Sequence, residues 1–245
     1  LEPGSDGQYG SLCPEGVVYN LEVESNHTYL ANGFVVHNCH HLPGSGSWQK
    51  LLAQHPESLL IGMTATPMSN SGNGLGHHFD VMVQCPSIAE LTKQGYLVPM
   101  RYFAPSLPDL EGVRIRAGDY AEEELAERVD RPKLIGEVCE NWSRICPDKK
   151  TICFATGVKH SMHLAEAFNK LGVKAAHVDG TTDKEERDRI IKQFRDEDLQ
   201  MLVNCAVFTE GTDLPAASCL IFARPTKSRV MYLQVAGRVL RPFPG

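Results

Sequence analysis

A histidine, an asparagine and a cysteine stand side by side at His37-Asn38-Cys39, and they hold the groups needed to break a peptide bond. The side-chain amide of Asn38 can attack its own carbonyl carbon, which closes a succinimide and releases the chain that follows. The imidazole of His37 can polarise that carbonyl or carry the proton. Cys39 offers a thiolate that can accept an acyl group. The tripeptide alone favours an ordinary surface loop, so its meaning depends on the residues around it.

Further polar residues follow apolar runs, at places where α/β folds bind ligands. Thr64-Ala65-Thr66 comes directly after the apolar run 58–63, and its small hydroxyl groups can relay between a nucleotide and a neighbouring site. A second polar run, 208–215, follows the apolar residues 201–203. Taken alone, these runs are equally consistent with a strand-end turn and a polar loop.

The last predicted helix separates polar from apolar residues. Gln234, Arg238 and Arg241 fall on one helical stripe, and Tyr232, Val235, Ala236 and Val239 fall on the opposite one. Two arginines on a rigid helix are suited to stabilise negative charge on a transferring phosphoryl group. A solvated basic face is the commoner meaning of such a stripe.

A predicted hairpin would deliver His37-Asn38 to a strand end. Residues 17–23 alternate as in a half-buried strand, and Asn32-Gly33 separates the β-prone runs 28–30 and 34–36. Asn-Gly between two such runs is a strong hairpin signal, because both residues accept positive φ.

Strand and helix patterns alternate over residues 132–245. Strands are expected at 151–155, 173–178, 201–203 and 219–222. Apolar helical stripes are expected at Leu134, Val138, Trp142 and Ile145, at Leu164, Ala167, Phe168 and Leu171, and at Ile190, Ile191 and Phe194. The last of these helices opens with Thr182 and Glu185 in capping-box spacing. This alternation predicts a parallel sheet covered on both faces. A helix is also expected near 87–94, and a polar connector with one solvated helix at 106–131.

Composition sets further bounds. The 245 residues carry 24 basic and 30 acidic side chains, a net charge of -6, so nucleic-acid binding would need a local basic patch.

No apolar run is long enough to cross a bilayer. The chain begins at Leu1 rather than Met, which indicates a piece of a longer protein. The scattered cysteines lack a CxxC pair, which argues against a disulfide framework and a zinc ribbon and for a reducing cytoplasm. His40-His41 and His77-His78 match no known metal-site spacing, so no metal site is expected. The cysteines are Cys13, Cys39, Cys85, Cys139, Cys146, Cys153, Cys205 and Cys219.

The order of these features over residues 17–39 closely resembles the C-terminal splicing blocks of an intein. The blocks are Val18 to Val23, His27-Thr28-Tyr29, Asn32-Gly33 and Val35 to Cys39. In that family the terminal asparagine cyclises, and the following cysteine takes the upstream chain. The resemblance implies splicing roles for His27, His37, Asn38 and Cys39. Asn20 departs from the Asp that many inteins carry. The N-terminal splicing blocks are absent, so at most cleavage after Asn38 is expected.

Residues 39–245 resemble a superfamily 2 helicase of the DEAD/DEAH type. Cys39-His40-His41 looks like the end of a DECHH form of motif II, Thr64-Ala65-Thr66 like motif III, and Thr151 to Ser161 like motif IV. Thr209 to Pro215 looks like motif V, and Gln234 to Arg241 like motif VI. The resemblance implies two RecA-like domains that bind ATP between them and a DNA strand, or an RNA strand, across both.

Site roles are carried over from that resemblance. It implies that Arg238 and Arg241 reach the γ-phosphate and that Gln234 orders the attacking water. Thr64, Ala65 and Thr66 would couple hydrolysis to domain closure. ATP binding is implied for Gly211 and Asp213. Nucleic-acid contacts are implied for Thr156, Gly180, Thr181, Thr209 and Glu210.

The expected organisation is α/β with a short all-β segment in front. Residues 1–38 would be the C-terminal part of an intein, 39–105 the end of the first RecA-like domain, 106–131 a connector and 132–245 most of the second domain. The phosphate loop and the Asp-Glu pair that would hold Mg²⁺ are missing, so these residues alone are expected to be inactive as an ATPase. The expected function of the spliced, full-length protein is that of an ATP-dependent DNA helicase or translocase. The alternatives are a restriction- or remodelling-type DNA translocase and a self-cleaving module on an inert scaffold.

Overall fold

The structure is a computed structural model in which part of the chain can be described. The described residues are 28–31, 34–38, 50, 53–54, 56, 59–68, 74–76, 78–104, 107–196, 199–208 and 217–242. The chain divides into two compact units, Leu1–Thr64 and Ala65–Gly245, and each is described by itself.

The first unit contains the predicted hairpin. Strands β1 (Thr28–Ala31) and β2 (Phe34–Asn38) pair antiparallel, with Thr28 opposite His37. Strand β2 also pairs in parallel with β3 (Leu59–Met63), so that Asn38 lies opposite Met63. The hairpin prediction is confirmed. The sheet nevertheless continues across the boundary expected after residue 38, so a separate all-β segment is not what the described strands form.

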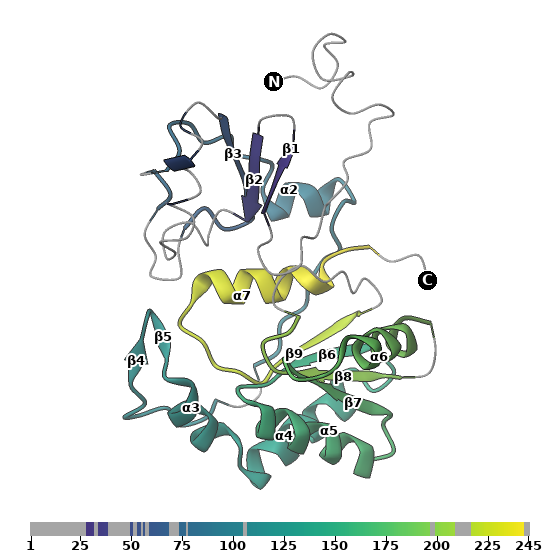
Figure 1. Cartoon of the computed structure of the whole chain (residues 1–245). Coiled ribbons are helices and arrows are strands. Elements are labelled where there is room, and N and C mark those ends of the chain that lie inside the picture. The colour runs from purple at the N-terminus through teal and green to yellow at the C-terminus, as the bar shows by residue number, and fades with distance from the viewer. Residues whose placement is uncertain are drawn as a thin grey trace. The chain divides into compact units, whose positions relative to one another are not determined.

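A parallel sheet forms the centre of the second unit. Its order is β7-β8-β6-β9, and every neighbouring pair is parallel (Figure 1). The strands are β6 (Thr151–Phe154), β7 (Ala175–Val178), β8 (Met201–Asn204) and β9 (Cys219–Phe222). Every residue of β6 and β8 is buried, which explains why these two strands are uninterrupted apolar runs. The predicted parallel sheet is therefore confirmed.

Helices cover both faces of this sheet, because alternate strand residues point to opposite sides. On one face, helices α4 (Pro132–Ile145) and α5 (Val158–Lys170) pack against Cys153 and Val203. On the other, α6 (Lys184–Asp196) and α7 (Arg229–Ala236) pack against Ile152 and Leu202. Helix α6 begins at Lys184, two residues after the predicted cap, because the Thr182 hydroxyl is bonded to Asp179 instead.

The helical stripes were predicted nearly in place. In α4 the buried residues are Ile135, Cys139 and Trp142, so the buried stripe is centred one position from the predicted one. Trp142 packs edge-on against Phe168 of α5, with ring centroids 5.4 Å apart, and its indole N–H donates to Thr151 Oγ1 at 2.8 Å. Leu171 was expected in the core but is 57% exposed, because α5 has already ended at Lys170.

The connector is more ordered than its polar sequence indicates. Helix α3 (Glu122–Val129) buries Leu125 and Val129, and a short hairpin of β4 (Ile115–Arg116) and β5 (Asp119–Tyr120) precedes it. Positive φ angles at Ala117 and Gly118 form the hairpin turn. The hairpin was not predicted, and the expectation of a solvated helix is wrong for one face of α3.

Among the described residues of 65–104, one short helix is present. Helix α2 (Ile88–Lys93) has a complete capping box, in which Ser87 Oγ accepts from Glu90 N and Glu90 accepts from Ser87 N. This confirms the helix predicted near 87–94. Among the described helices, none combines the length and the apolar character that crossing a bilayer requires.

Candidate functional site

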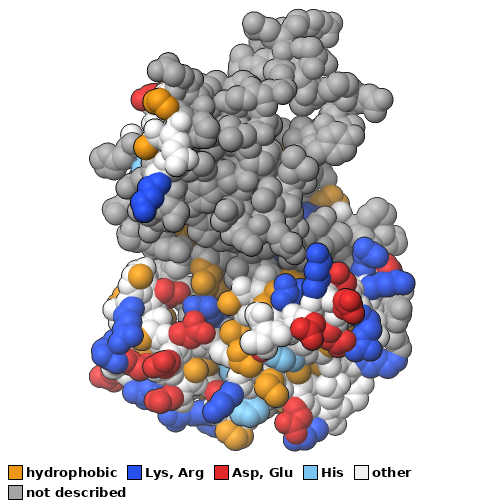
Figure 2. Space-filling model, in the orientation of Figure 1, with side chains coloured by type: hydrophobic (Ala, Val, Ile, Leu, Met, Phe, Trp, Pro, Cys, Tyr) orange, Lys and Arg blue, Asp and Glu red, His pale blue; other side chains and the backbone are white. Residues whose placement is uncertain are grey.

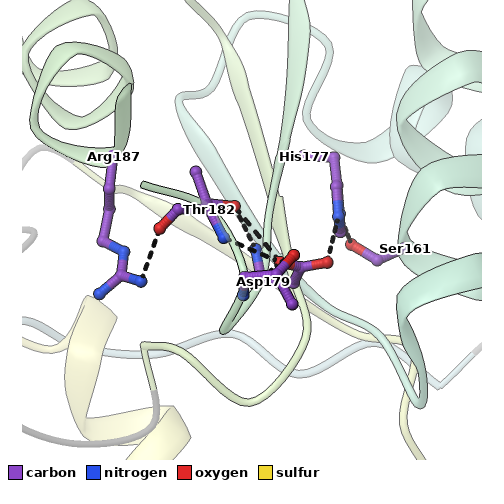
Figure 3. Close-up of polar contacts among 6 residues, drawn as sticks. Ser161, His177, Asp179, Thr182 and Arg187 are labelled. Atoms are coloured by element: carbon purple, nitrogen blue, oxygen red, sulfur yellow. Dashed lines mark hydrogen bonds and ion pairs between the residues drawn. The ribbon is translucent and has the colours of Figure 1, made fainter. Parts of the chain in front are cut away.

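A chain of hydrogen bonds fixes the loop that follows β7 (Figure 3). The carboxylate of Asp179 only accepts, so His177 donates from Nε2 to Asp179 Oδ2 at 3.2 Å. The Nδ1 atom of the same ring is hydrogen-bonded to the Ser161 hydroxyl of α5 at 2.6 Å. A Ser-His-Asp series also occurs in hydrolases, but Ser161 is fully buried and its oxygen is out of reach of a substrate. The series therefore ties α5 to the loop after β7.

Asp179 closes this loop by accepting several hydrogen bonds at one oxygen. Its Oδ1 accepts the backbone N–H of Thr181 at 2.7 Å, the Thr181 hydroxyl at 2.7 Å and the Thr182 N–H at 3.1 Å. The bond from the Thr181 side chain is the main cause that lowers the pKa of Asp179 to about 2. Arg187 of α6 donates to Thr182 O at 3.1 Å, which connects the loop to that helix.

The hydrogen bonds that Asp179 accepts affect how Gly180 and Thr181 could make the predicted contacts with nucleic acid. Both residues are exposed, as such a contact requires. The hydroxyl and the backbone N–H of Thr181, however, already donate to Asp179. The loop is thus held in a fixed shape on the surface, and the predicted role as a hydroxyl donor to phosphate would have to compete with Asp179.

Thr156, two residues after the end of β6, lies inside the domain. It is fully buried, its hydroxyl points to Ala223 O at 3.5 Å, and its backbone N–H donates to His160 Nδ1 at 3.3 Å. Burial lowers the pKa of His160 to about 4, so the ring is neutral and can accept this bond. The geometry supports a structural role for the Thr156 side chain rather than a direct contact with nucleic acid.

The arginine-bearing end of the chain differs from one continuous helix. Helix α7 ends at Ala236, and a 3₁₀ turn, η3 (Gly237–Val239), follows. Of the three predicted residues, Gln234 lies in α7, Arg238 in the 3₁₀ turn, and Arg241 beyond both. The prediction that one helical stripe holds all three is therefore wrong. Of the four residues predicted on the opposite, buried side, Val235 and Ala236 are buried and Val239 packs against the core, whereas Tyr232 is 38% exposed.

The same helix brings two distant predicted motifs together. Gln234 Nε2 lies 3.5 Å from Thr66 Oγ1, and Thr66 is buried. A backbone bond from Val98 N to Leu240 O at 2.8 Å holds the segment around Val98 against the end of the chain. Residues that are 168 positions apart thus meet within the second unit. Ala65 is exposed and Thr64 half-buried.

Several predicted site residues lie outside the described residues or have no described side chain. Gly211 and Asp213, expected to bind ATP, are outside the described ranges. The same holds for Thr209 and Glu210, and for His27 and Cys39 of the splicing site. His37 and Asn38 are described as the last two residues of β2, at the carboxyl end of the pair with β3.

The charge of the surface agrees with the composition. On the face shown in Figure 2, basic and acidic side chains are interspersed over the second unit.

Among the described residues, no group of three or more His, Cys, Asp or Glu side chains is arranged to hold a metal ion.

Sequence reasoning missed the residues that fix the loops of the site. Asp179 stands directly before Gly180 at a strand end, and Asp-Gly is a turn signal that indicates an Asp accepting from the next residues. Asp119 accepts from Thr226 Oγ1 and Lys227 N, both at 2.7 Å, and so positions the loop before α7. No local signal predicts that contact, because the partners are more than a hundred residues apart.

Comparison with known proteins identifies the second half of the chain. Residues 134–242 match the family model described as the helicase conserved C-terminal domain. A 51.5 kDa protein of a Lactococcus phage is 31% identical over 197 residues, which cover 80% of this chain and 43% of that protein. A Schizosaccharomyces pombe protein whose name describes a mitochondrial ATP-dependent helicase, irc3, is 29% identical, covering 96% of this chain and 42% of that protein. The Saccharomyces cerevisiae protein named as the ATP-dependent helicase IRC3 is 27% identical, covering 87% of this chain and 32% of that protein.

Residues 134–242 are therefore similar to a helicase C-terminal domain, and they contain the parallel sheet β7-β8-β6-β9. The chain spans less than half the length of each of these relatives. The family match begins at residue 134, so it does not include residues 1–38. The alignment with the fission yeast protein leaves only about 10 residues of this chain uncovered, so it includes most of residues 1–38.

Proposed function

We propose that the intact protein is an ATP-dependent helicase or translocase that moves along DNA, and that residues 39–245 supply the arginine side of its ATP site. The observation that carries the proposal is the contact between Gln234 and Thr66. It joins two motifs that the family resemblance assigns to hydrolysis and to its coupling, and Gln234, Arg238 and Arg241 all lie within the family match. Coupling of ATP hydrolysis to domain closure requires such a contact, because closure has to change the position of the groups around the phosphate.

The chemistry of the side chains fits ATP as the bound group. When bound, ATP with Mg²⁺ supplies the phosphoryl group whose transfer releases the free energy for movement. A guanidinium presents planar donors that match phosphate oxygens and stays charged at any physiological pH. In this proposal Arg238 and Arg241 stabilise the γ-phosphate and Gln234 orients water, while Gly211 and Asp213 bind the nucleotide. Gly180, Thr181, Thr209 and Glu210 face the nucleic acid, and Thr64 and Thr66 couple hydrolysis to closure.

The experiment is steady-state ATP hydrolysis by the full-length protein from its natural reading frame, with single-stranded DNA, with RNA of the same sequence, and without either. The expected result is turnover that DNA stimulates at least tenfold more than RNA does. Stimulation by RNA alone would overturn the choice of DNA, and an absence of ATP hydrolysis in all three conditions would overturn the motor. A remodelling- or restriction-type translocase uses the same ATP site, and it would show DNA stimulation without strand separation.

We also propose that residues 1–38 are the C-terminal part of an intein and that excision joins Cys39 to the host's own motif II. The hairpin β1–β2 supports this, because it ends at Asn38 and so places His37-Asn38 at a strand end. The competing account makes residues 34–38 a strand of the first helicase domain. That account rests on the parallel pairing of β2 with β3 and on the fission yeast alignment, which covers most of residues 1–38.

Cleavage distinguishes the two accounts. If the chain is purified and incubated at neutral pH, intact-mass spectrometry is expected to show slow cleavage between Asn38 and Cys39. The variant Asn38→Ala should block it, and Asn73→Ala, outside the splicing blocks, is the matched control that should not. A chain that stays intact for days would contradict a splicing-competent half-site and leave the strand account standing.

A further inference from the structure

Four cysteines of the second unit gather where α4 meets the strands β6 and β9. Cys139 of α4 and Cys153 of β6 are buried in the same apolar core. Cys146, directly after α4, and Cys219, the first residue of β9, are half-buried and pack against that core. Burial is the main cause that raises the pKa of Cys139, to about 11, and of Cys146, to about 12. At neutral pH these two are therefore thiols.

One pair in this group is much closer than ordinary packing requires. The Sγ atoms of Cys146 and Cys219 lie 3.1 Å apart, although the residues are 73 positions apart in the chain. Both backbones are anchored, since Cys146 N donates to Trp142 O at 2.9 Å and Cys219 N donates to Lys150 O at 3.1 Å. A disulfide has an S–S length of about 2.05 Å, so closing the bond requires the sulfurs to approach by about 1 Å.

We propose that Cys146 and Cys219 form a redox-responsive dithiol that closes to a disulfide when a hydroperoxide reaches it. One thiol gives up its proton as its sulfur attacks a peroxide oxygen; the O–O bond breaks, and the hydroxide that leaves takes that proton, so that a sulfenic acid and water result. The second thiol likewise gives up its proton as its sulfur attacks the sulfenic sulfur, and the hydroxide that is expelled takes this proton to form a second water. The two sulfurs lose two electrons and two protons in total, and hydrogen peroxide is reduced to two waters.

Exposure selects this pair from the four cysteines. Cys139 and Cys153 are 4% and 0% exposed, so a small oxidant in solvent cannot reach them in the folded domain. Cys146 and Cys219 are each partly exposed. A metal centre is a poorer fit, because the described residues offer no third ligand group arranged with the two thiols.

A disulfide between Cys146 and Cys219 would link two elements of the domain that are far apart in the sequence. It would join the end of α4 to the start of β9. A cross-link over so long a loop restricts the unfolded chain and therefore raises the thermal stability of the domain. The proposal is independent of the proposed motor function, since it concerns only the two thiols and the elements that hold them.

The test uses the full chain with Cys13, Cys39 and Cys85 replaced by Ser and the buried Cys205 replaced by Ala, so that thiols outside the group do not react. After treatment with hydrogen peroxide, the intact mass should fall by two hydrogens, and a proteolytic digest should contain a peptide joined through Cys146 and Cys219. Dithiothreitol should restore the original mass. The oxidised protein should melt several degrees higher than the reduced protein.

Substitutions make the result specific. Cys146→Ser and Cys219→Ser should each abolish the linked peptide and the rise in melting temperature, while Cys139→Ala should keep both. Circular dichroism of each variant shows whether it is folded, and Cys219→Ala replaces Cys219→Ser if the polar side chain prevents folding. Two results would overturn the proposal. One is a linked peptide that involves Cys139 or Cys153. The other is the absence of any link between Cys146 and Cys219 at a peroxide concentration that oxidises the exposed Cys85 in the unsubstituted chain.

Discussion

At the scale of single residues, Asp179 shows how one carboxylate can set the shape of a loop at the edge of the sheet. It accepts from Thr181 and Thr182 on one oxygen and from His177 on the other. These bonds favour the charged form, so the pKa of Asp179 falls to about 2, chiefly through the Thr181 side chain. Asp179 stabilises the folded chain fully at pH values above about 3.9, the pKa of an Asp side chain in an unfolded chain. This stabilisation is lost as the pH falls toward about 2, the pKa of Asp179 in the folded chain.

We therefore expect Asp179→Asn to lower the free energy of unfolding by about 1–3 kcal/mol at pH 7, the usual cost of disturbing buried hydrogen bonds to a charged group. The difference from the unsubstituted chain should be smaller at pH 3 than at pH 7, because part of the carboxylate's contribution is lost there. Urea unfolding at pH 3 and at pH 7 measures this difference in the free energy of unfolding. Asp188→Asn, an exposed position on α6, is the control. A penalty that stays constant with pH would contradict the assigned cause.

Ala206 is a second residue with a local consequence. It follows β8 with a φ of 59°, a left-handed conformation that costs a residue with a Cβ about 1–2 kcal/mol. Replacing it by Gly should stabilise the domain by about 0–1 kcal/mol, since the greater freedom of Gly in the unfolded chain offsets part of the gain. Ala206→Val should destabilise it. Thermal unfolding of the pair checks the sign, and a more stable Val variant would refute the argument.

At the scale of elements, the sheet and its helices were predictable because their cause is local. Uninterrupted apolar runs gave β6 and β8, and apolar residues at helical spacing gave α4, α5 and α6 to within a residue or two. The hairpin of β4 and β5 was missed because its strands are only two residues long, too short to show an alternating pattern. The end of α7 was missed because nothing in a helical stripe shows where α-helix changes to 3₁₀ turn.

The β4–β5 hairpin is expected to position the loop before α7. Asp119 accepts from Thr226 and Lys227, and Ser228 then caps the helix by accepting from Met231 N. Asp119→Ala should remove this docking, destabilise the domain by about 1–2 kcal/mol and speed proteolysis in residues 110–121.

Limited proteolysis followed by mass spectrometry measures the change. Asp109→Ala is the matched control, because Asp109 Oδ1 accepts a bond from Glu111 N within its own loop. Equal cleavage rates in the two variants would show that Asp119 does not hold the hairpin.

At the scale of the whole molecule, the order of motifs could be read from the sequence, but their assembly could not. The contact between Gln234 and Thr66 depends on how the chain returns across the domain, and no spacing along the sequence encodes it. The same is true of Thr156, which was expected to face nucleic acid and is buried beside His160. The roles proposed for Arg238 and Arg241 stay predictions.

The measurement that tests the central claim most directly is ATP turnover by the full-length protein carrying Arg238→Ala or Arg241→Ala. Loss of a guanidinium that stabilises the transferring phosphoryl group costs about 10³–10⁵ in turnover in related reactions. We expect each variant to lose at least a hundredfold in kcat, while nucleotide binding changes little. Arg229→Ala, an exposed arginine in the first turn of α7, should keep its turnover. Turnover within threefold of the unsubstituted protein in both arginine variants would contradict the account.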